Sequence, residues 1–466
     1  MELEERLSYL EHVQDWQGLA EELEKGIASA PAQADKARFH LKLGRVLETK
    51  FLAGVKALKH FQDAYKLNPA LIESLESARR IYWGLGKLNM VQKLLELELK
   101  AGPEGARASA LLLELGDVLS DQGEWEKAAA AYAKSLGASG GKNAGASAAL
   151  EDAQLDAARW QEHLAGLLRI AGQDASAAGK ARAFLRASRI ARRFAPDEAE
   201  AMLSRAYFAD AGDKQVAALY EGVLADQGRF DALEQAQRQI LEELDSASRA
   251  NVALLFGTRW ILRHQNVEFG ARFLEEALRL DPRSEGAFFF LRDAYGKKAG
   301  DWVRVLDLAE AAATRAEDGT STFLLAEAGT IAWRELGNLI RARTSFERLS
   351  AVSPEHPQLR AFEAQIGETL KPASGPAPTD TVVAPAVPAP ASEPSRAVAP
   401  TATPAAAPVA AAPTPPPPPA APAVVVDEAK VAELRQLAEK QEAAKRYNEY
   451  VKTLLQLAGL VGDPEE

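Results

Sequence analysis

The sequence predicts an all-α protein built as a solenoid of repeated helical hairpins. Apolar residues recur at helical spacing throughout residues 1–370, as in 111–119 and 269–280, and strand-like alternation is almost absent. A pattern of glycine, small, large and proline residues also returns several times along this region. In a solenoid each repeat buries its apolar face only against its neighbours, so we expect an extended concave surface.

The repeated pattern begins at a glycine and ends at a proline. Three segments of equal length show it, namely Gly44–Pro69, Gly257–Pro282 and Gly329–Pro354. Each contains a small residue followed four positions later by a large one: Ala57 and Phe61, Gly270 and Leu274, Ala342 and Phe346. Small residues let two helices approach closely, the large residue fills the next groove on the same face, and proline ends the hairpin. The spacing therefore predicts one helical hairpin for each copy.

Two weaker copies and a longer period extend this pattern. Gly116, Ala128 and Tyr132 form a fourth copy without the proline, and a fifth lies near Ala187 or Ser188 and Leu203. A bulky residue after a turn recurs about every 71 residues, at Trp16, Leu88, Trp160, Phe230 and Trp302. The duplicated unit is therefore expected to be a pair of hairpins, and about five such units would fill residues 1–370.

The hairpin pattern resembles the tetratricopeptide repeat, and the double-hairpin layout is similar to long bacterial arrays of that family. The family's glycine, alanine, phenylalanine, alanine and proline positions match Gly44, Ala57, Phe61, Ala64 and Pro69. The departures are an extra loop residue in three copies, Gly270 where alanine is usual, and Ser135 for alanine. The resemblance implies a right-handed superhelix in which the first helix of each hairpin lines a concave surface that holds a peptide.

The sequence predicts a different organisation after residue 370. Residues 371–426 are rich in Pro, Ala, Val and Thr, a composition that favours a disordered, polyproline-biased linker. Residues 427–466 return to helical spacing and predict a short C-terminal helical hairpin, which could be the start of a further repeat. The pattern starts in mid-period at the N-terminus and restarts after the linker, which suggests a piece of a longer repeat protein, and the sequence alone does not decide this.

Composition excludes several classes of function. The net charge of −11 and the absence of cysteine argue against a nucleic-acid binder, a disulfide framework, thiolate catalysis and a cysteine-type zinc site. We find no run of apolar residues that would form a membrane-spanning helix. The alanine-rich, cysteine-free composition is typical of a bacterial cytosol, so we expect a cytoplasmic protein.

Motif searches predict no catalytic residues, no metal site and no cofactor. A GxSxG match at Gly137–Gly141 lacks the preceding strand of a nucleophile elbow, and the overlapping glycine-rich stretch lacks the phosphate-loop spacing. The six histidines are not spaced as metal ligands. We therefore expect the chain not to be an enzyme.

An arginine stripe is the candidate binding site. Arg182, Arg186, Arg189 and Arg193 follow one another at steps of four, three and four, which places their guanidinium groups on one helix face. The resemblance implies that this face lines the groove, where planar arginine donors would suit an acidic peptide or a phosphate. The other interpretation is a solvated face paired with nearby acids such as Asp197, Glu198 and Glu200. The family's dicarboxylate clamp is absent, since Leu41, Arg45, Leu113 and Asp117 occupy the comparable places.

The function predicted from the sequence is a non-enzymatic protein-interaction scaffold that binds a peptide or helix of a partner protein in its concave groove. The alternative is a structural segment of a large assembly, or of a longer repeat protein, without a single ligand groove. The sequence indicates neither the oligomeric state nor the identity of the partner.

Overall fold

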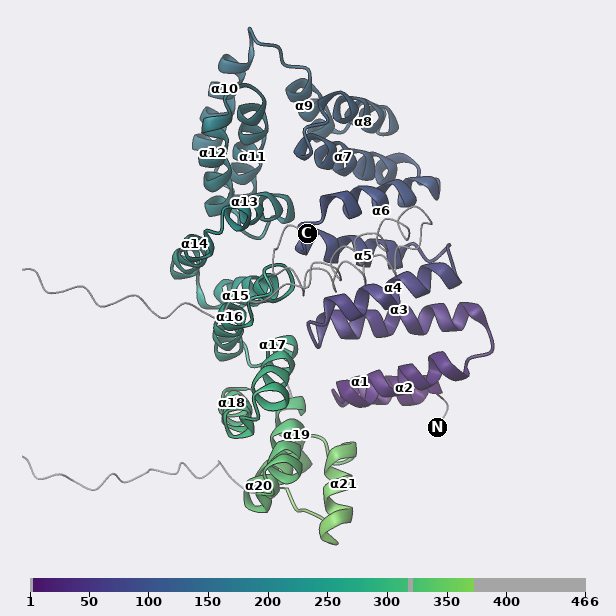
Figure 1. Ribbon diagram of the computed structural model, residues 1–466. Helices are drawn as coiled ribbons and strands as arrows, with labels where there is room; N and C mark the ends of the chain where they lie inside the picture. The colour runs from purple at the N-terminus through teal and green to yellow at the C-terminus, as the bar shows by residue number, and fades with distance from the viewer. Residues whose placement is uncertain (1–2, 317–321, 373–466) are drawn as a thin grey trace, which may run out of the picture. The chain divides into compact units, whose positions relative to one another are not determined.

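The computed structural model describes residues 3–316 and 322–372, which belong to one compact unit, Met1–Pro378. These residues form 21 α-helices, two of which continue into π-helical turns, and they contain no strand (Figure 1). The predicted all-α solenoid class is confirmed. The predicted linker, after its first two residues, and the predicted hairpin at 427–466 lie outside the described residues.

The copies of the glycine pattern are hairpins of two adjacent helices. They are α3 (Gln33–Thr49) with α4 (Gly54–Leu67), α7 (Gly105–Asp121) with α8 (Trp125–Ala138), α11 (Ala177–Phe194) with α12 (Pro196–Ala209), α15 (Ser246–Leu262) with α16 (Val267–Leu280), and α19 (Thr322–Thr330), continued by η2 (Ile331–Glu335), with α20 (Leu339–Val352).

The remaining helices alternate with these hairpins. They are α1 (Leu3–His12), α2 (Trp16–Ser29), α5 (Glu73–Gly84), α6 (Leu88–Lys100), α9 (Ala144–Ala153), α10 (Trp160–Gln173), α13 (Lys214–Asp226), α14 (Phe230–Glu242), α17 (Glu285–Leu291) with its continuation η1 (Arg292–Lys298), α18 (Trp302–Arg315) and α21 (Pro357–Ile366). Helix α9 packs on α8, whereas α10 packs on α11, so these two consecutive helices join neighbouring hairpins.

The glycine pattern reflects direct contact between paired helices. A Cβ atom added at Gly44 would lie 2.5 Å from the Phe61 ring, and one at Gly116 would lie 2.4 Å from the Tyr132 ring. In a third copy, a Cβ atom added at Gly329 would lie 2.7 Å from the Phe346 ring. Only glycine leaves room for the large residue at this distance. The fold is therefore an array of helical hairpins, as the sequence predicts.

The longer period has a structural basis at the starts of helices. Trp16, Leu88, Trp160, Phe230 and Trp302 are the first residues of α2, α6, α10, α14 and α18, so the period spans four helices. Asp15 and Asp301 precede two of these residues and cap their helices, because their side chains accept hydrogen bonds from the backbone N–H groups of Gly18 and Arg304.

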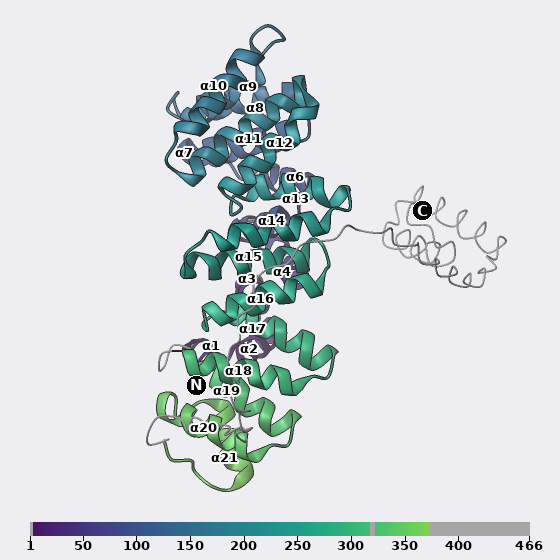
Figure 2. The same ribbon diagram turned by 90° about the vertical axis from the view of Figure 1, so that its left-hand side faces the viewer.

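The two halves of the array also contact each other. Figure 1 shows the purple and blue helices α1–α7 beside the teal and green helices α13–α20, and Figure 2 shows the same helices from the left-hand side. Lys50, the residue that follows α3, forms an ion pair of 3.0 Å with Glu285 of α17, and Lys214 at the start of α13 forms one of 2.6 Å with Glu114 of α7. A hydrophobic cluster contains both Leu43 and Phe288. We call these contacts between the first and second halves the seam.

The seam corrects one expectation. The expectation that each repeat contacts only its neighbours is wrong, because apolar residues of α1–α3 share one buried cluster with residues of α16–α21. Contacts across the seam join the end of α3 to α17, α5 to α13, and α7 to α11. The inner surface of the array is therefore partly filled by side chains of the protein itself.

Candidate functional site

Helix α11 carries the predicted arginine stripe. The helix begins after Ser176, whose hydroxyl accepts a hydrogen bond from the Gly179 backbone N–H, and it ends at Phe194, two residues before Pro196. Its small buried residues Ala187 and Ala191 let α12 pack closely against it. This packing fixes the direction in which the stripe points.

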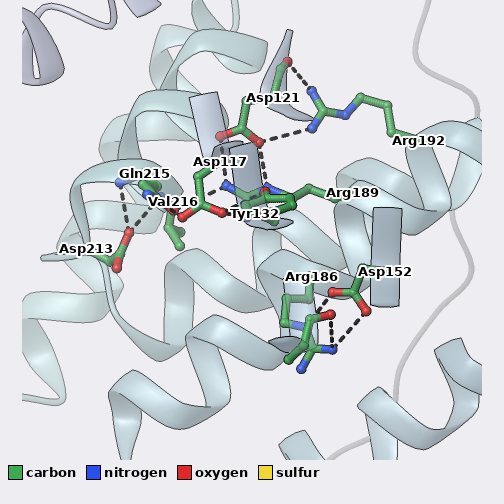
Figure 3. Close-up of polar contacts among 11 residues, drawn as sticks. Asp117, Asp121, Tyr132, Asp152, Arg186, Arg189, Arg192, Asp213, Gln215 and Val216 are labelled. Carbon is green, nitrogen blue, oxygen red and sulfur yellow. Dashed lines mark hydrogen bonds and ion pairs between the residues drawn. The ribbon is translucent and has the colours of Figure 1, made fainter. Parts of the chain in front are cut away.

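Arg189 lies at the centre of the site (Figure 3). Its Nε donates to Asp121 Oδ1 at 2.7 Å and its Nη2 donates to Asp121 Oδ2 at 2.9 Å, which is a bidentate pair. Its Nη1 also donates to Asp117 Oδ1 at 3.0 Å. Both aspartates belong to α7, where their spacing of four residues places them on one helix face. Arg189 therefore joins α11 to α7 across the seam.

Two further elements complete the surroundings of Asp117. The Tyr132 hydroxyl of α8 donates to Asp117 Oδ1 at 2.9 Å, and the Gln215 amide of α13 donates to Asp117 Oδ2 at 3.0 Å. Gln215 is held at the start of α13 by the cap residue Asp213, which accepts its backbone N–H. Helices from both halves of the array thus converge on one carboxylate.

Arg186 and Arg192 contact other carboxyl or carbonyl oxygens. Arg186 Nη2 donates to Asp152 Oδ1 of α9 at 2.8 Å, and the same oxygen lies 2.8 Å from His163 Nε2 of α10. Arg192 Nη1 donates to the Asp121 backbone carbonyl at 2.8 Å. The arginine face of α11 therefore binds acidic groups of both α7 and α9.

The ends of the stripe are exposed. Arg193 donates from Nη1 to the Ala153 carbonyl at 3.1 Å and lies over the Phe194 ring, at 4.8 Å from its centroid. Arg182 is exposed and has no ion pair or hydrogen bond within the described part of the chain. The four predicted residues thus lie on one helix, but they differ in environment: the central two bind carboxylates and Arg182 faces solvent.

Burial and charge set the protonation of the central groups. Burial alone would lower the pKa of the Arg189 guanidinium, but Asp121 and Asp117 outweigh this effect and raise that pKa well above its ordinary value. Burial raises the pKa of the Asp117 carboxyl, although Arg189 acts in the opposite direction. The Tyr132 pKa is also raised, by burial and by Asp117, so its hydroxyl remains a proton donor.

Sequence reasoning did not identify the acidic partners of the stripe. The sequence suggests Asp197, Glu198 and Glu200 as neighbours, but Glu200 pairs with Arg229 at 2.6 Å instead. The actual partners Asp117 and Arg189 are 72 residues apart, which is the step of the longer period. Equivalent positions of successive units therefore carry opposite charges, and this complementarity is the signal that could have revealed the contact.

The other motifs have structural roles within the described residues. Gly137–Gly141 covers the end of α8 and the turn before α9, where the Ser139 hydroxyl donates to the Leu136 carbonyl at 2.9 Å. In the described part of the chain no group of three His, Asp or Glu residues is placed to hold a metal ion, and none of its helices is both long and apolar enough to span a bilayer.

Comparisons with known proteins found similar chains among solved structures. No family model and no curated protein sequence matches the chain. Among solved structures, the chain is similar to the P58(IPK) TPR domain at 11% identity and a TM-score of 0.21, with 78% of this chain and 96% of that chain covered. It is also similar to yeast Tom70, at 13% identity and a TM-score of 0.22, covering 71% of this chain and 89% of that one. A third similar structure is a chain of Naa15/Naa10 bound to HypK-THB, at 13% identity and a TM-score of 0.25, covering 78% of this chain and 65% of that one.

Proposed function

We propose that the chain is a non-enzymatic protein-interaction scaffold that binds an acidic helix or extended peptide of a partner protein along the arginine face of α11. The observation that best supports this function is the chemistry of the seam. Arg189 already binds two carboxylates spaced four residues apart on a helix, at 2.7 and 3.0 Å. An external helix with the same spacing of Asp or Glu would offer the same carboxylate acceptors to the arginine N–H donors.

The exposed part of the stripe is the point of entry. Arg189 is occupied by Asp117 and Asp121, so a partner first meets Arg182, one helical turn before the half-buried Arg186. A hydrogen bond to a charged group contributes about 1.5–3 kcal/mol, and Arg offers two parallel donors to a carboxylate. A partner that engages Arg182 therefore depends measurably on this side chain.

A pulldown from a source-cell lysate tests the proposal with matched charge reversals. The baits are the unchanged chain, Arg182→Glu and Arg169→Glu. Arg169 is a suitable control because it is an exposed arginine on the adjacent helix α10. We expect at least one protein to be enriched by the unchanged chain and by Arg169→Glu but lost with Arg182→Glu. Circular dichroism must first show that all three baits are equally helical.

The structural alternative is favoured by a different feature of the same region. The inner faces of α7 and α11 hold each other through buried ion pairs, since the Asp121 side chain is 0% exposed and that of Arg189 is 9% exposed. A segment of a large assembly needs such internal bracing and no free groove. Recovery of the same proteins by all three baits, or only of further copies of the chain, would contradict the groove proposal and favour this alternative.

A further inference from the structure

A cavity in the seam lies apart from the arginine stripe. It has a volume of about 270 Å³, is partly open to solvent and lies between helices α3–α5 of the first half and α13 and α15 of the second. Its wall is mainly hydrocarbon, with Ile81, Trp83, Leu255 and Leu262 among the lining residues. At about 30 Å³ per water-sized group, this space accommodates roughly nine non-hydrogen atoms.

Three cations of the cavity wall are paired with carboxylates. Arg80 forms a bidentate pair with Glu48, at 2.8 and 2.6 Å, and Lys214 contacts Glu114 at 2.6 Å. Arg259 donates to Glu221 Oε1 at 3.1 Å, and the Tyr207 hydroxyl donates to the same oxygen at 3.0 Å. These pairs leave no surplus charge of their own.

Arg263 is the fourth cation of the wall, and it has no carboxylate to itself. Its Nη1 lies 3.8 Å from Glu221 Oε2, but Glu221 already pairs with Arg259. Its hydrogen bonds go to neutral backbone carbonyls, those of Ala217 at 3.2 Å and Ala218 at 2.6 Å. The Arg263 side chain is only 10% exposed, so solvent compensates little of its charge. Three carboxylates thus pair with the four cations of the wall, so these pairs leave one positive charge over, and Asp226 has only a weaker influence on Arg263.

A buried charge next to an apolar space is best satisfied by a ligand that combines both properties. We propose that this cavity binds a small organic monocarboxylate with a compact apolar body, whose carboxylate pairs with Arg263 and whose hydrocarbon part lies against Ile81, Leu255 and Leu262. A dianion would exceed the surplus charge of the wall, and a neutral molecule would leave Arg263 uncompensated. The proposal is independent of partner binding at α11.

Benzoate and benzamide are the matched probes, since both have nine non-hydrogen atoms and only benzoate is charged. Calorimetric titration of the whole chain should show one benzoate site, and benzamide should bind at least tenfold more weakly. Hexanoate, which is aliphatic, should compete with benzoate because the wall requires apolar contact rather than an aromatic ring.

Variants locate the site. Arg263→Met should weaken benzoate binding at least tenfold because it removes the surplus charge, and Leu255→Trp should abolish it by filling the cavity. Arg182→Glu should leave benzoate binding unchanged, which separates this site from the arginine stripe. Circular dichroism and thermal melting identify any variant that fails to fold. If Arg263→Met is unfolded, Leu255→Trp still tests whether benzoate binds in the cavity.

Three outcomes would overturn the proposal. They are no benzoate binding up to millimolar concentrations, equal binding of benzamide, and binding that survives Leu255→Trp in a folded protein. Loss of benzoate binding with Arg182→Glu is a fourth contradicting outcome, because the carboxylate would then lie at the stripe. None of these outcomes bears on whether a partner protein binds α11.

Discussion

Replacement of Arg189 by methionine should destabilise the protein strongly, because it leaves two buried carboxylates without their main partner. Removal of one member of a buried ion pair costs about 3–5 kcal/mol. The remaining contacts reduce the loss: Asp121 keeps Arg192 at 3.3 Å, and Asp117 keeps the Tyr132 hydroxyl at 2.9 Å. We therefore expect a decrease of about 3 kcal/mol in the free energy of unfolding, at the lower end of this range.

Urea unfolding followed by circular dichroism measures this loss, and hydrogen exchange locates it. Amide protection should decrease first in α7 and α11, the two helices that Arg189 joins. Arg182→Met is the control, since it changes an exposed arginine of the same helix and should cost less than about 0.5 kcal/mol. The loss in the free energy of unfolding for Arg189→Lys should lie between those of Arg189→Met and Arg182→Met, because lysine keeps the charge but not the planar, bidentate guanidinium group.

The pH dependence gives a second check. Burial raises the pKa of Asp117, and loss of Arg189 removes an influence that lowers this pKa. A carboxyl whose pKa is raised by folding favours the folded state at low pH and opposes it as the pH rises through the folded pKa. The difference between Arg189→Met and the unchanged chain should therefore narrow as the pH falls from 7 towards 4. A loss below about 1 kcal/mol at pH 7, equal to that of Arg182→Met, would refute the reasoning.

Two further predictions concern helix packing and protonation. Gly44→Ala should destabilise the protein by about 1–3 kcal/mol in urea unfolding, because the new Cβ would lie 2.5 Å from Phe61. The control Gly166→Ala in α10 should stabilise it by about 0.5–1 kcal/mol, because nothing lies within 4 Å of the new Cβ. Equal effects of the two substitutions would contradict the contact between Gly44 and Phe61. Burial lowers the pKa of His356 to about 4 from an ordinary 6.5. Its stabilising contribution is thus present above pH 6.5 and lost as the pH falls towards 4, by about 3 kcal/mol in total. His356→Asn should abolish this slope between pH 7 and 5, and an unchanged slope would assign the acid sensitivity to other groups.

The sequence predicts the repeats because local contacts determine them. Gly44 and Phe61 contact each other within one hairpin, so their spacing in the chain is enough to predict the packing. The recurrence of Trp16 and Trp302 likewise reflects a local event, the start of a helix after an Asp cap. The all-α solenoid follows from these short-range patterns.

The seam could not be predicted in the same way. It depends on the sum of the small rotations between successive hairpins, and no local pattern encodes that sum. Lys50 and Glu285 are 235 residues apart, and no local pattern joins them. Similarly, the helical spacing of the arginines predicts their common face but not the carboxylates that occupy it. The cytoplasmic location and the bacterial origin stay predictions, as does the disordered linker.

The central claim, that the two halves of the array pack along a seam, can be tested directly by a disulfide. Residues Leu52 and Gly286 lie on opposite sides of the seam, and a Cβ at Gly286 would lie 3.1 Å from Leu52 Cγ and 2.9 Å from the Thr49 carbonyl oxygen, so the variant requires a small local shift. The two Cβ atoms would thus be at most about 4.6 Å apart, close to the range of a disulfide. The chain contains no cysteine of its own, so the pair Leu52→Cys and Gly286→Cys forms no competing bond.

Oxidation of this double variant should produce an intramolecular disulfide, seen as blocked thiols in mass spectrometry of the intact monomer. The control pair combines Leu52→Cys with Gly166→Cys, whose position in α10 has nothing within 4 Å. Both of its thiols should remain free. Two free thiols in the oxidised Leu52→Cys/Gly286→Cys protein, with its helix content unchanged, would contradict the account.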